Sequence, residues 1–299
     1  MLTKLKLYMR TRSPIWLYWF GRRVRHIPLH LRNLLHTKEE NGLTDAQFVT
    51  ISYKEVFFDL LLDPANGLID ESIYTTGVWE PNVSSFIYDQ LNDGNVFLDV
   101  GANIGYFSLL SAKRVGSSGQ VIAFEPIGTL ATQLERSVEK NSLTNIKLIR
   151  SACGEREASM KIGKYKHNIG KSSLIDAGME QLETETVTVL TIDSVLENTH
   201  RLDLIKIDVE GFEPEVLMGA RKTLSRLRPV IILEFGPKRM LSKVGGADST
   251  TAMFELLKSL NYKIRSIKGE EVQDAKEFTA RQISIGSFVE LICIPENES

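Results

Sequence analysis

Between residues 96 and 234, short apolar runs alternate with stretches in which apolar residues recur at helical spacing. The runs at 96–99, 121–125, 146–150, 204–208 and 230–234 are predicted strands. The stretches at 104–110, 130–138 and 217–227 place their apolar side chains on one helix face. Strands that alternate with helices predict an α/β fold, in which helices cover both faces of a parallel sheet.

The segments around this core carry weaker patterns. Residues 46–62 predict a small β element, and residues 84–91 predict a helix. Two extra strands are expected at 159–162 and 184–190, around a polar loop, and two late strands at 262–267 and 288–294 are expected to be joined by another polar loop. Pro214 is predicted to lie in the first turn of the helix that runs through residue 227, and Asp193 is predicted to be a helix N-cap.

Three parts follow from these patterns: a basic N-terminal extension at 1–45, a small β and helical lead-in at 46–95, and a Rossmann-like domain at 96–299. Hydrophobic residues make up 42% of the 299 residues and charged residues 25%, which is enough apolar surface for a substantial core. The net charge of −2 hides an asymmetry, because residues 1–38 hold nine Lys and Arg and no acidic residue.

The basic segment at 1–38 interleaves its cations with aromatic residues such as Trp16 and Trp19. This composition suits peripheral contact with a membrane surface, and it equally suits a helix that packs its aromatic side chains on the body. An RNA contact is a third reading, which the acidic balance of the whole chain disfavours.

No apolar run approaches the roughly 18 residues of a membrane span, and the apolar run at 14–20 lacks a small-residue cleavage site, so we expect neither a transmembrane helix nor a secretory signal peptide. The two cysteines, Cys153 and Cys293, fit a reducing compartment. We therefore expect a cytoplasmic protein, with peripheral contact at the inner membrane surface as an open extension of that expectation.

Acidic residues end four of the five predicted core strands: Asp99, Glu125, Asp208 and Glu234. The carboxyl ends of parallel strands form the ligand crevice of an open α/β sheet. Phosphate groups would instead require glycine-cradled amides and lysines there, and the chain has no GxxxxGK motif. A dinucleotide fingerprint would need glycine at the positions of Asn103 and Tyr106.

The segment that starts at Asp99 has the form D-x-G-x-x-x-G, directly after a strand and before a helix. Gly101 and Gly105 allow the main chain to come close to a ligand without pyrophosphate. Glu125, at the tip of the next strand, can accept hydrogen bonds from both hydroxyls of a ribose. A ligand with a ribose, no phosphate and a positive charge fits this set, and S-adenosylmethionine has all three features.

Five motifs then carry a family resemblance across residues 70–237: Trp79-Glu80-Pro81, DVGANIGYFS at 99–108, AFEP at 123–126, IKIDVEGFEPEVLMGA at 205–220 and RPVIILEF at 228–235. In this order they closely resemble the FkbM family of methyltransferases. The resemblance implies a seven-stranded class I methyltransferase sheet, S-adenosyl-L-methionine as the cofactor, and acceptors that are hydroxyls of sugars or natural products.

The resemblance also implies site residues. The methionine part of the cofactor is expected to lie along Asp99, Gly101, Ala102, Asn103 and Gly105, and its methyl group beside Asp208. The ribose is expected at Glu125 and Pro126, and the adenine edge at Ser151 and Ala152. Trp79 and Glu80 are expected to cover the crevice.

The residues that we expect to act on the acceptor lie around Asp208, the candidate general base. Glu210 is expected to share its face on a continuing strand, and Lys206 is expected to keep Asp208 ionised. Alternatively, Lys206 and Glu210 act only as salt-bridge partners. His167, in the polar loop at 164–173, is a second candidate base, unless that loop is an ordinary solvated one.

Asp208, Glu210 and Glu234 could together hold a magnesium ion, but we expect no metal, because methyl transfer needs alignment more than a Lewis acid. The function that we expect is O-methylation of a hydroxyl on a sugar, a glycan or a natural product, with a lipid-linked glycan among the possible acceptors. Two alternatives stay open: a methyltransferase that acts on RNA or protein, and a non-catalytic relative that binds a nucleoside.

Overall fold

The computed structural model describes residues 46–63, 68–164, 173–174, 183–242, 246–286 and 288–296. The basic segment at 1–38 and His167 lie outside these residues, so the expectations for both stay predictions. In the described part, no helix combines the length and the apolar character that crossing a membrane requires.

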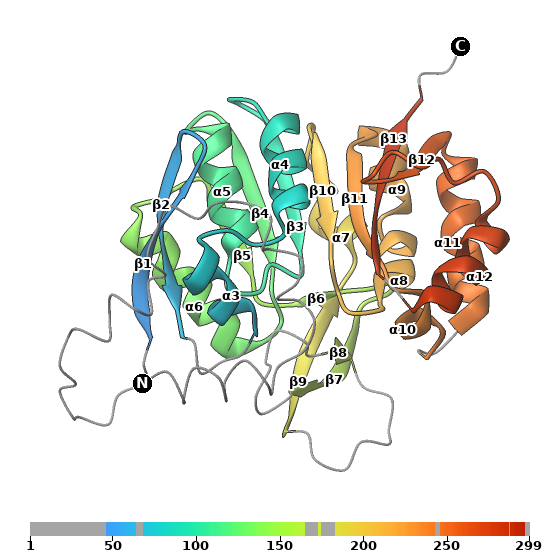
Figure 1. Cartoon of the computed structure of the whole chain (residues 1–299), viewed down its shortest axis with the longest axis horizontal. Coiled ribbons are helices and arrows are strands. Elements are labelled where there is room, and N and C mark those ends of the chain that lie inside the picture. The colour runs from blue at the N-terminus through green and yellow to red at the C-terminus, as the bar shows by residue number, and fades with distance from the viewer. Residues whose placement is uncertain are drawn as a thin grey trace, which may run out of the picture. The chain divides into compact units, whose positions relative to one another are not determined.

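A seven-stranded sheet forms the centre of the described part, in the order β12-β13-β11-β10-β3-β4-β5 (Figure 1). Its strands are β3 (Val96–Val100), β4 (Gln120–Phe124), β5 (Ile146–Ile149), β10 (Leu204–Ile207), β11 (Val230–Phe235), β12 (Tyr262–Ser266) and β13 (Val289–Pro295). The five strands predicted from 96–234 pair in parallel, and β13 pairs antiparallel with both of its neighbours. The predicted α/β class and the seven-stranded sheet are confirmed.

The strands are apolar throughout because both faces of the sheet are buried. Phe97 of β3 belongs to the core on one face, and Leu98, the next residue, belongs to the core on the other face. The first core includes α5 (Tyr106–Val115) and α6 (Gly128–Lys140), and the second includes α8 (Glu213–Met218), α9 (Arg221–Leu227) and α11 (Gly246–Ser259).

The lead-in is a hairpin followed by two helices. Strands β1 (Gln47–Tyr53) and β2 (Val56–Leu62) pair antiparallel, and β2 packs against α5 and α6. Helices α3 (Leu68–Thr76) and α4 (Pro81–Gln90) come next. The predicted β element and the predicted helix are both confirmed.

A second sheet interrupts the alternation, as predicted. It has the order β6-β9-β7-β8, with β6 (Ala152–Cys153), β7 (Ala158–Lys164), β8 (Ser173–Leu174) and β9 (Glu183–Leu190). Figure 1 shows β7 and β9 below the central sheet, with the short β6 leading from that sheet to β9.

The helix that was predicted to run through residue 227 is two helices, so this prediction was wrong. Helix α8 ends at Met218 and α9 begins at Arg221. A Cβ at Gly219 would overlap the carbonyl oxygen of Gly154, so the chain bends where it touches the loop after β6. Pro214 does lie in the first turn of α8.

The prediction that Asp193 caps its own helix was also wrong. Thr191 caps α7 (Ile192–Val195), because its side chain accepts the N–H of Ser194. The carboxylate of Asp193 instead accepts the N–H groups of Lys222 and Thr223 at 3.0 and 2.7 Å, in the first turn of α9. A carboxylate at a helix N-terminus is stabilising wherever in the chain it comes from.

The polar connection between β12 and β13 contains helix α12 (Ala275–Ile285), which the sequence pattern did not predict. Asp274 caps this helix by accepting the N–H groups of Lys276 and Glu277. Only Phe278 and Gln282 are buried on it, one turn apart. A single buried pair is too weak a periodic signal among polar neighbours. The remaining short helix is α10 (Pro237–Leu241), directly after β11.

Candidate active site

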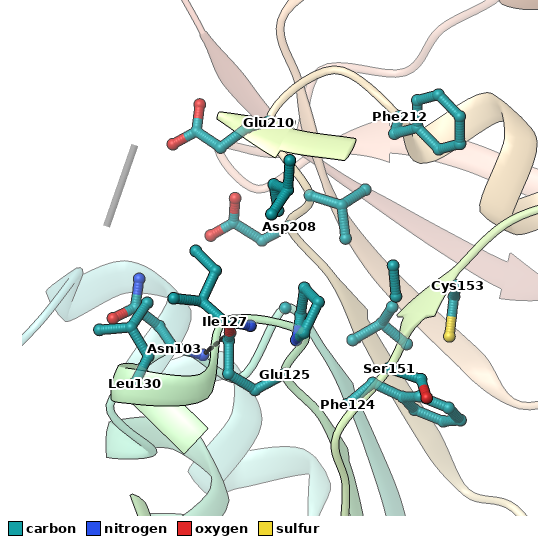
Figure 2. Close-up of a pocket in the computed structure, with 16 residues that line it drawn as sticks. Asn103, Phe124, Glu125, Ile127, Leu130, Ser151, Cys153, Asp208, Glu210 and Phe212 are labelled. Carbon is teal, nitrogen blue, oxygen red and sulfur yellow. Dashed lines mark hydrogen bonds between the residues drawn. The ribbon is translucent and has the colours of Figure 1, made fainter. Parts of the chain in front are cut away.

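A pocket opens at the carboxyl ends of β3, β4 and β10, where a parallel sheet is expected to bind its ligand (Figure 2). Asn103 and Glu125 lie on its β3–β4 side, and Asp208 and Glu210 lie on its β10 side. It is lined by Val100, Gly101, Asn103, Phe124, Glu125, Pro126, Ile127, Leu130, Ser151, Ala152, Cys153, Ile162, Asp208, Val209, Glu210 and Phe212.

The turn between β3 and α5 forms the pocket floor with its main chain. Gly101 has φ +85°, and a Cβ there would overlap the carbonyl oxygen of Asp208. The N–H groups of Gly101 and Ala102 donate to the carbonyl of Phe124, and Asn103 has φ 54°. Glycine at position 101 is therefore required so that the β3 turn and the end of β10 can touch.

Three of the predicted residues on this turn do not line the pocket: Asp99, Ala102 and Gly105. Gly105 begins α5 with φ +92°, and a Cβ there would overlap the side chain of Leu134 in α6. Ala102 is buried in the core. What the structure shows for Gly105 is helix packing, and its contact with a cofactor stays a prediction.

Asp99 lies inside β3 and is fully buried, with one carboxylate oxygen accepting the hydroxyl of Ser108 at 2.6 Å. The other oxygen has no hydrogen-bond partner among the described residues. Burial raises the pKa of Asp99, and the neighbouring ammonium of Lys206 opposes this shift. Asp99 thus lies beside Lys206 as a buried carboxyl that does not line the pocket.

Glu125 is held in place by two main-chain donors. Its carboxylate accepts the N–H groups of Asn103 and Ile127, each at 2.8 Å, and only 4% of the residue is exposed. Burial raises its pKa to about 7. Each carboxylate oxygen has a further lone pair, so the residue can still accept hydroxyl donors from the pocket.

One wall of the pocket comes from the chain after β5 and from the second sheet, with Ser151, Ala152, Cys153 and Ile162, and Pro126 after β4 adjoins it. The predicted contacts of Pro126, Ser151 and Ala152 with the cofactor stay predictions. This wall is mostly apolar, which suits the flat face of a nucleobase.

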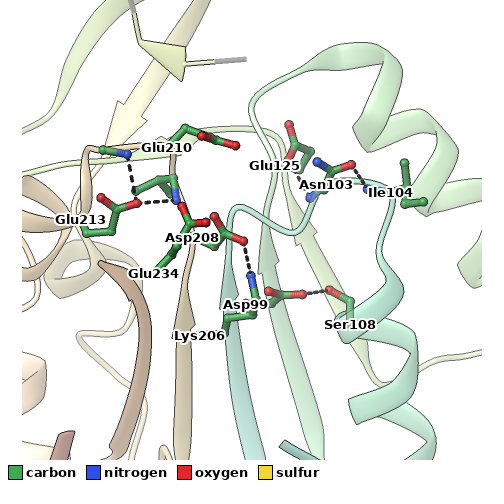
Figure 3. A network of polar contacts seen from close by, with 12 residues as sticks. Asp99, Asn103, Ile104, Ser108, Glu125, Lys206, Asp208, Glu210, Glu213 and Glu234 are labelled. Carbon is green, nitrogen blue, oxygen red and sulfur yellow. Dashed lines mark hydrogen bonds and ion pairs between the residues drawn. The ribbon is translucent and has the colours of Figure 1, made fainter. Parts of the chain in front are cut away.

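Lys206 and Asp208 form an ion pair of 2.9 Å on the β10 side of the pocket (Figure 3). The predicted proximity of the two side chains is therefore confirmed. Lys206 is 4% exposed, and its ammonium lies 4.9 Å from the ring centre of Phe107. Burial lowers the pKa of Lys206, but Asp208, Glu80 and Asp99 raise it by more, so the ammonium stays charged.

Glu210 does not continue the strand, so that prediction was wrong. Strand β10 ends at Ile207, and Glu210 has the left-handed φ of 57°. Its carboxylate forms an ion pair with Arg239 of α10, which also pairs with Glu234 at 2.9 Å. Gly211, with φ +100°, packs against the main chain of Arg239, and this contact explains why the chain leaves the sheet here.

Carboxylates crowd around Asp208. Burial and then the charge of Asp208 raise the pKa of Glu80 to about 8 and that of Glu234 to about 9. Glu80 is not among the residues that line the pocket, but this coupling places it near Asp208. Glu80 is the N-cap residue of α4 and has a φ of 40°. Trp79, beside it, is partly buried against the core.

Oxygens of Asp208, Glu213 and Glu234 lie within 4.8 Å of one another. This set differs from the magnesium ligands considered above, because Glu213 takes the place of Glu210. Each of the three already has a donor: Lys206 for Asp208, main-chain N–H groups for Glu213 and Arg239 for Glu234. Sequence reasoning missed Glu213 and Arg239, although Glu213 stands within the GFEP motif.

The strand order, with its one antiparallel strand next to the edge, is typical of class I methyltransferases, and the glycine turn with the Glu125 carboxylate lies at the ligand end of this sheet. The family profile described as methyltransferase FkbM domain matches residues 99–264, more than half of the chain. The chain belongs to this family, and the family resemblance seen in the sequence is confirmed.

The chain is similar to several known proteins. AMB antimetabolite synthetase AmbE of Pseudomonas aeruginosa is 27% identical over 206 residues, which cover 56% of this chain and 10% of that protein. Methyltransferase 1 of Beauveria bassiana is 26% identical over 147 residues, which cover 42% of this chain and 59% of that protein. The chain therefore spans only part of the length of these relatives. A crystal structure of the FkbM methyltransferase of Methylobacillus flagellatus aligns with 68% of this chain and 44% of its own, at 19% identity and a TM-score of 0.43.

Proposed function

We propose that this methyltransferase methylates a hydroxyl group of a sugar, a glycan or another natural product, and that Asp208 is the general base. The observation that carries the proposal is the position of Asp208: it lines the pocket, its side chain is 23% exposed, and a buried ammonium holds it. A carboxylate that reaches the pocket and is fixed from behind is suited to accept a proton.

The pocket residues fit the cofactor. Glu125 would hold the ribose hydroxyls, the wall with Ser151 and Ala152 would face the adenine, and the β3 turn with Gly101 and Asn103 would face the methionine part. When bound, S-adenosylmethionine supplies an electrophilic methyl group.

The chain itself has to place the acceptor hydroxyl and remove its proton, because an un-ionised hydroxyl is a weak nucleophile. The pKa values of Glu80 and Glu234 are raised to about 8 and about 9, first by burial and then by the charge of Asp208. Neither of these residues lines the pocket, whereas Asp208 does. Asp208 is therefore the carboxylate that we assign to take the proton of the acceptor.

The test is incubation of the whole chain with methyl-labelled S-adenosylmethionine and extracts of cell envelope, polysaccharide and small molecules, followed by chemical identification of the labelled product. A labelled methyl ether that is absent with Asp208→Asn supports the proposal. Label on RNA or protein would overturn the acceptor class. Label on nothing, with the cofactor bound, would favour a non-catalytic relative.

The proposal extends to location. The basic, aromatic composition of residues 1–38 supports a cytoplasmic enzyme that contacts the membrane surface, where a lipid-linked glycan would be found. Removal of residues 1–38 is expected to abolish sedimentation with vesicles of phosphatidylglycerol and phosphatidylcholine, while binding of S-adenosylhomocysteine is retained. Equal sedimentation with and without the segment would exclude this role.

A further inference from the structure

The turn that follows β10 carries Asp208, Val209 and Glu210 along the pocket wall, and its backbone is strained. Glu210 and Gly211 both have left-handed φ angles, 57° and 100°. A residue other than glycine in this conformation costs roughly 1 kcal/mol or more, so surrounding contacts have to hold it there. The question is which contacts do so.

Glu213, in the first turn of α8, makes the main-chain contacts. One oxygen of its carboxylate accepts the N–H of Val209 at 3.0 Å and the N–H of Gly211 at 3.1 Å (Figure 3). These two N–H groups flank the strained residue. Glu213 is 1% exposed, so water cannot replace the carboxylate as the acceptor.

Other contacts fix the turn from two further sides. The N–H of Asp208 donates to the carbonyl of Val100 at 3.0 Å, and the carbonyl of Asp208 fits against Gly101. Arg239 pairs with the Glu210 side chain and packs against Gly211. Among these contacts, only those of Glu213 bind the peptide groups on both sides of Glu210.

We propose that Glu213 is a positioning residue, which holds the turn at 208–211 through its two main-chain hydrogen bonds and so sets where Asp208 faces the pocket. It touches neither the pocket space nor a reacting atom, because it is not among the lining residues. The role of Asp208 as the base rests on the proposed function, whereas the hydrogen bonds and their effect on the pocket do not.

Acceptance of the two hydrogen bonds, rather than negative charge, is the property required. Burial raises the pKa of Glu213 to about 7, so part of the population is neutral near neutral pH, and an oxygen atom accepts in either state. Glutamine keeps that oxygen at the same reach. Glu213→Gln should therefore preserve the turn, and Glu213→Leu should release it.

The direct test is amide hydrogen exchange, read by NMR at residues 209 and 211, together with calorimetric titration of S-adenosylhomocysteine. In Glu213→Leu the exchange at both amides should quicken by about a hundredfold or more, and affinity should fall by about tenfold. In Glu213→Gln the exchange rates at residues 209 and 211 and the affinity for S-adenosylhomocysteine should stay within a few-fold of those of the unmodified chain. Amides of β10 should remain protected in both variants, which shows that the sheet is intact.

A matched control separates positioning from general stability. Asp70 is also a buried carboxylate that accepts a main-chain N–H, from Asp63, and it does not line the pocket. Asp70→Leu should lower the melting temperature and leave the amides at 209 and 211 and the affinity unchanged. If Glu213→Leu does not fold, Glu213→Asp, which withdraws the acceptor by one methylene, takes its place.

Unchanged exchange at 209 and 211 in Glu213→Leu or Glu213→Asp would overturn the proposal, as would a Glu213→Gln variant as impaired as Glu213→Leu. Neither measurement needs a methyl acceptor. Failure to find a methylated product would therefore count against the proposed function alone.

Discussion

The two sides of the pocket are built differently. On the cofactor side, the turn from β3 to α5 is shaped by glycines and by main-chain hydrogen bonds to Phe124. On the acceptor side, the turn after β10 is held by charged side chains, chiefly Glu213 and Arg239.

This difference has a physical consequence. A main-chain turn does not depend on protonation, and it fails when a side chain is added. A turn held by side chains fails when an acceptor such as Glu213 is removed, or when an ion pair such as that of Arg239 with Glu210 is broken. The following predictions test that distinction.

The largest effect is expected from Asp208→Asn on the acceptor side. The variant keeps the shape of the side chain and loses the base, so methyl transfer should slow by about 10²–10⁴-fold. Single-turnover rates, measured with the acceptor identified by labelling, check this prediction, and Glu157→Gln at an exposed residue is the control.

Glu210→Gln should slow methyl transfer less than Asp208→Asn does, and His167→Ala should slow it only slightly. Near-normal turnover of Asp208→Asn with an inactive His167→Ala would move the base to the loop at 164–173.

On the cofactor side, Gly101→Ala should lower the free energy of unfolding by about 3 kcal/mol or more, because the new Cβ would overlap the Asp208 carbonyl oxygen and φ is +85°. Gly77 is the matched control, since its φ is +76° and nothing lies within 4 Å of its Cβ position. Gly77→Ala should cost only the backbone strain of about 1–2 kcal/mol. Urea unfolding curves measure both, and equal losses would contradict the close-contact explanation.

Glu125→Ala removes the acceptor expected for the ribose hydroxyls, at a cost of about 1–3 kcal/mol. The affinity for S-adenosylhomocysteine should fall about tenfold or more, by calorimetry, while the fold survives. The exposed Glu139→Ala on α6 should leave the affinity unchanged. An unchanged affinity in Glu125→Ala would remove Glu125 from the cofactor site.

The smallest effect is a difference in pH dependence between the two sides. A buried carboxyl with a raised pKa binds its proton more tightly in the folded state, so stability falls as pH rises from its unfolded pKa to its folded pKa. The window for Glu125 is from 4.5 to about 7, and for Glu234 from 4.5 to about 9.

Between pH 7 and 9, the unmodified chain should therefore lose stability that Glu234→Gln retains, at up to about 1.4 kcal/mol per pH unit. Glu125→Gln should change the dependence of the free energy of unfolding on pH only below pH 7. Urea unfolding at half-unit intervals of pH measures both slopes. Parallel curves for Glu234→Gln and the unmodified chain above pH 7 would show that the pKa of Glu234 is not raised into this range.

The two sides also differed in how well the sequence predicted them. Glycine spacing and apolar runs are local signals, so the sheet, the β3 turn and Glu125 could be predicted before any coordinates. The ion pair of Lys206 with Asp208 followed from the two-residue repeat of a strand. The same repeat gave a wrong prediction for Glu210, because the chain leaves the strand before this residue. The contacts that hold Glu210 and Gly211 come from Arg239 in α10, about 30 residues further along the chain.

The predictions of helix boundaries were wrong for a similar reason. The break at Gly219 depends on a loop near Gly154, and Asp193 caps a helix that begins at Arg221. Contacts between residues so far apart in the chain leave no periodic pattern. Arg239 and Glu213 carried no recognisable spacing either, and only coordinates could show that they meet at one turn.

The contact between Gly101 and the Asp208 carbonyl also limits how this enzyme could be redesigned. Since there is no room for even a methyl group between the two turns, any side chain at position 101 would push them apart and move Asp208. A redesign would therefore leave Gly101 and Asp208 unchanged and vary other residues that line the pocket, such as Leu130 and Ile162.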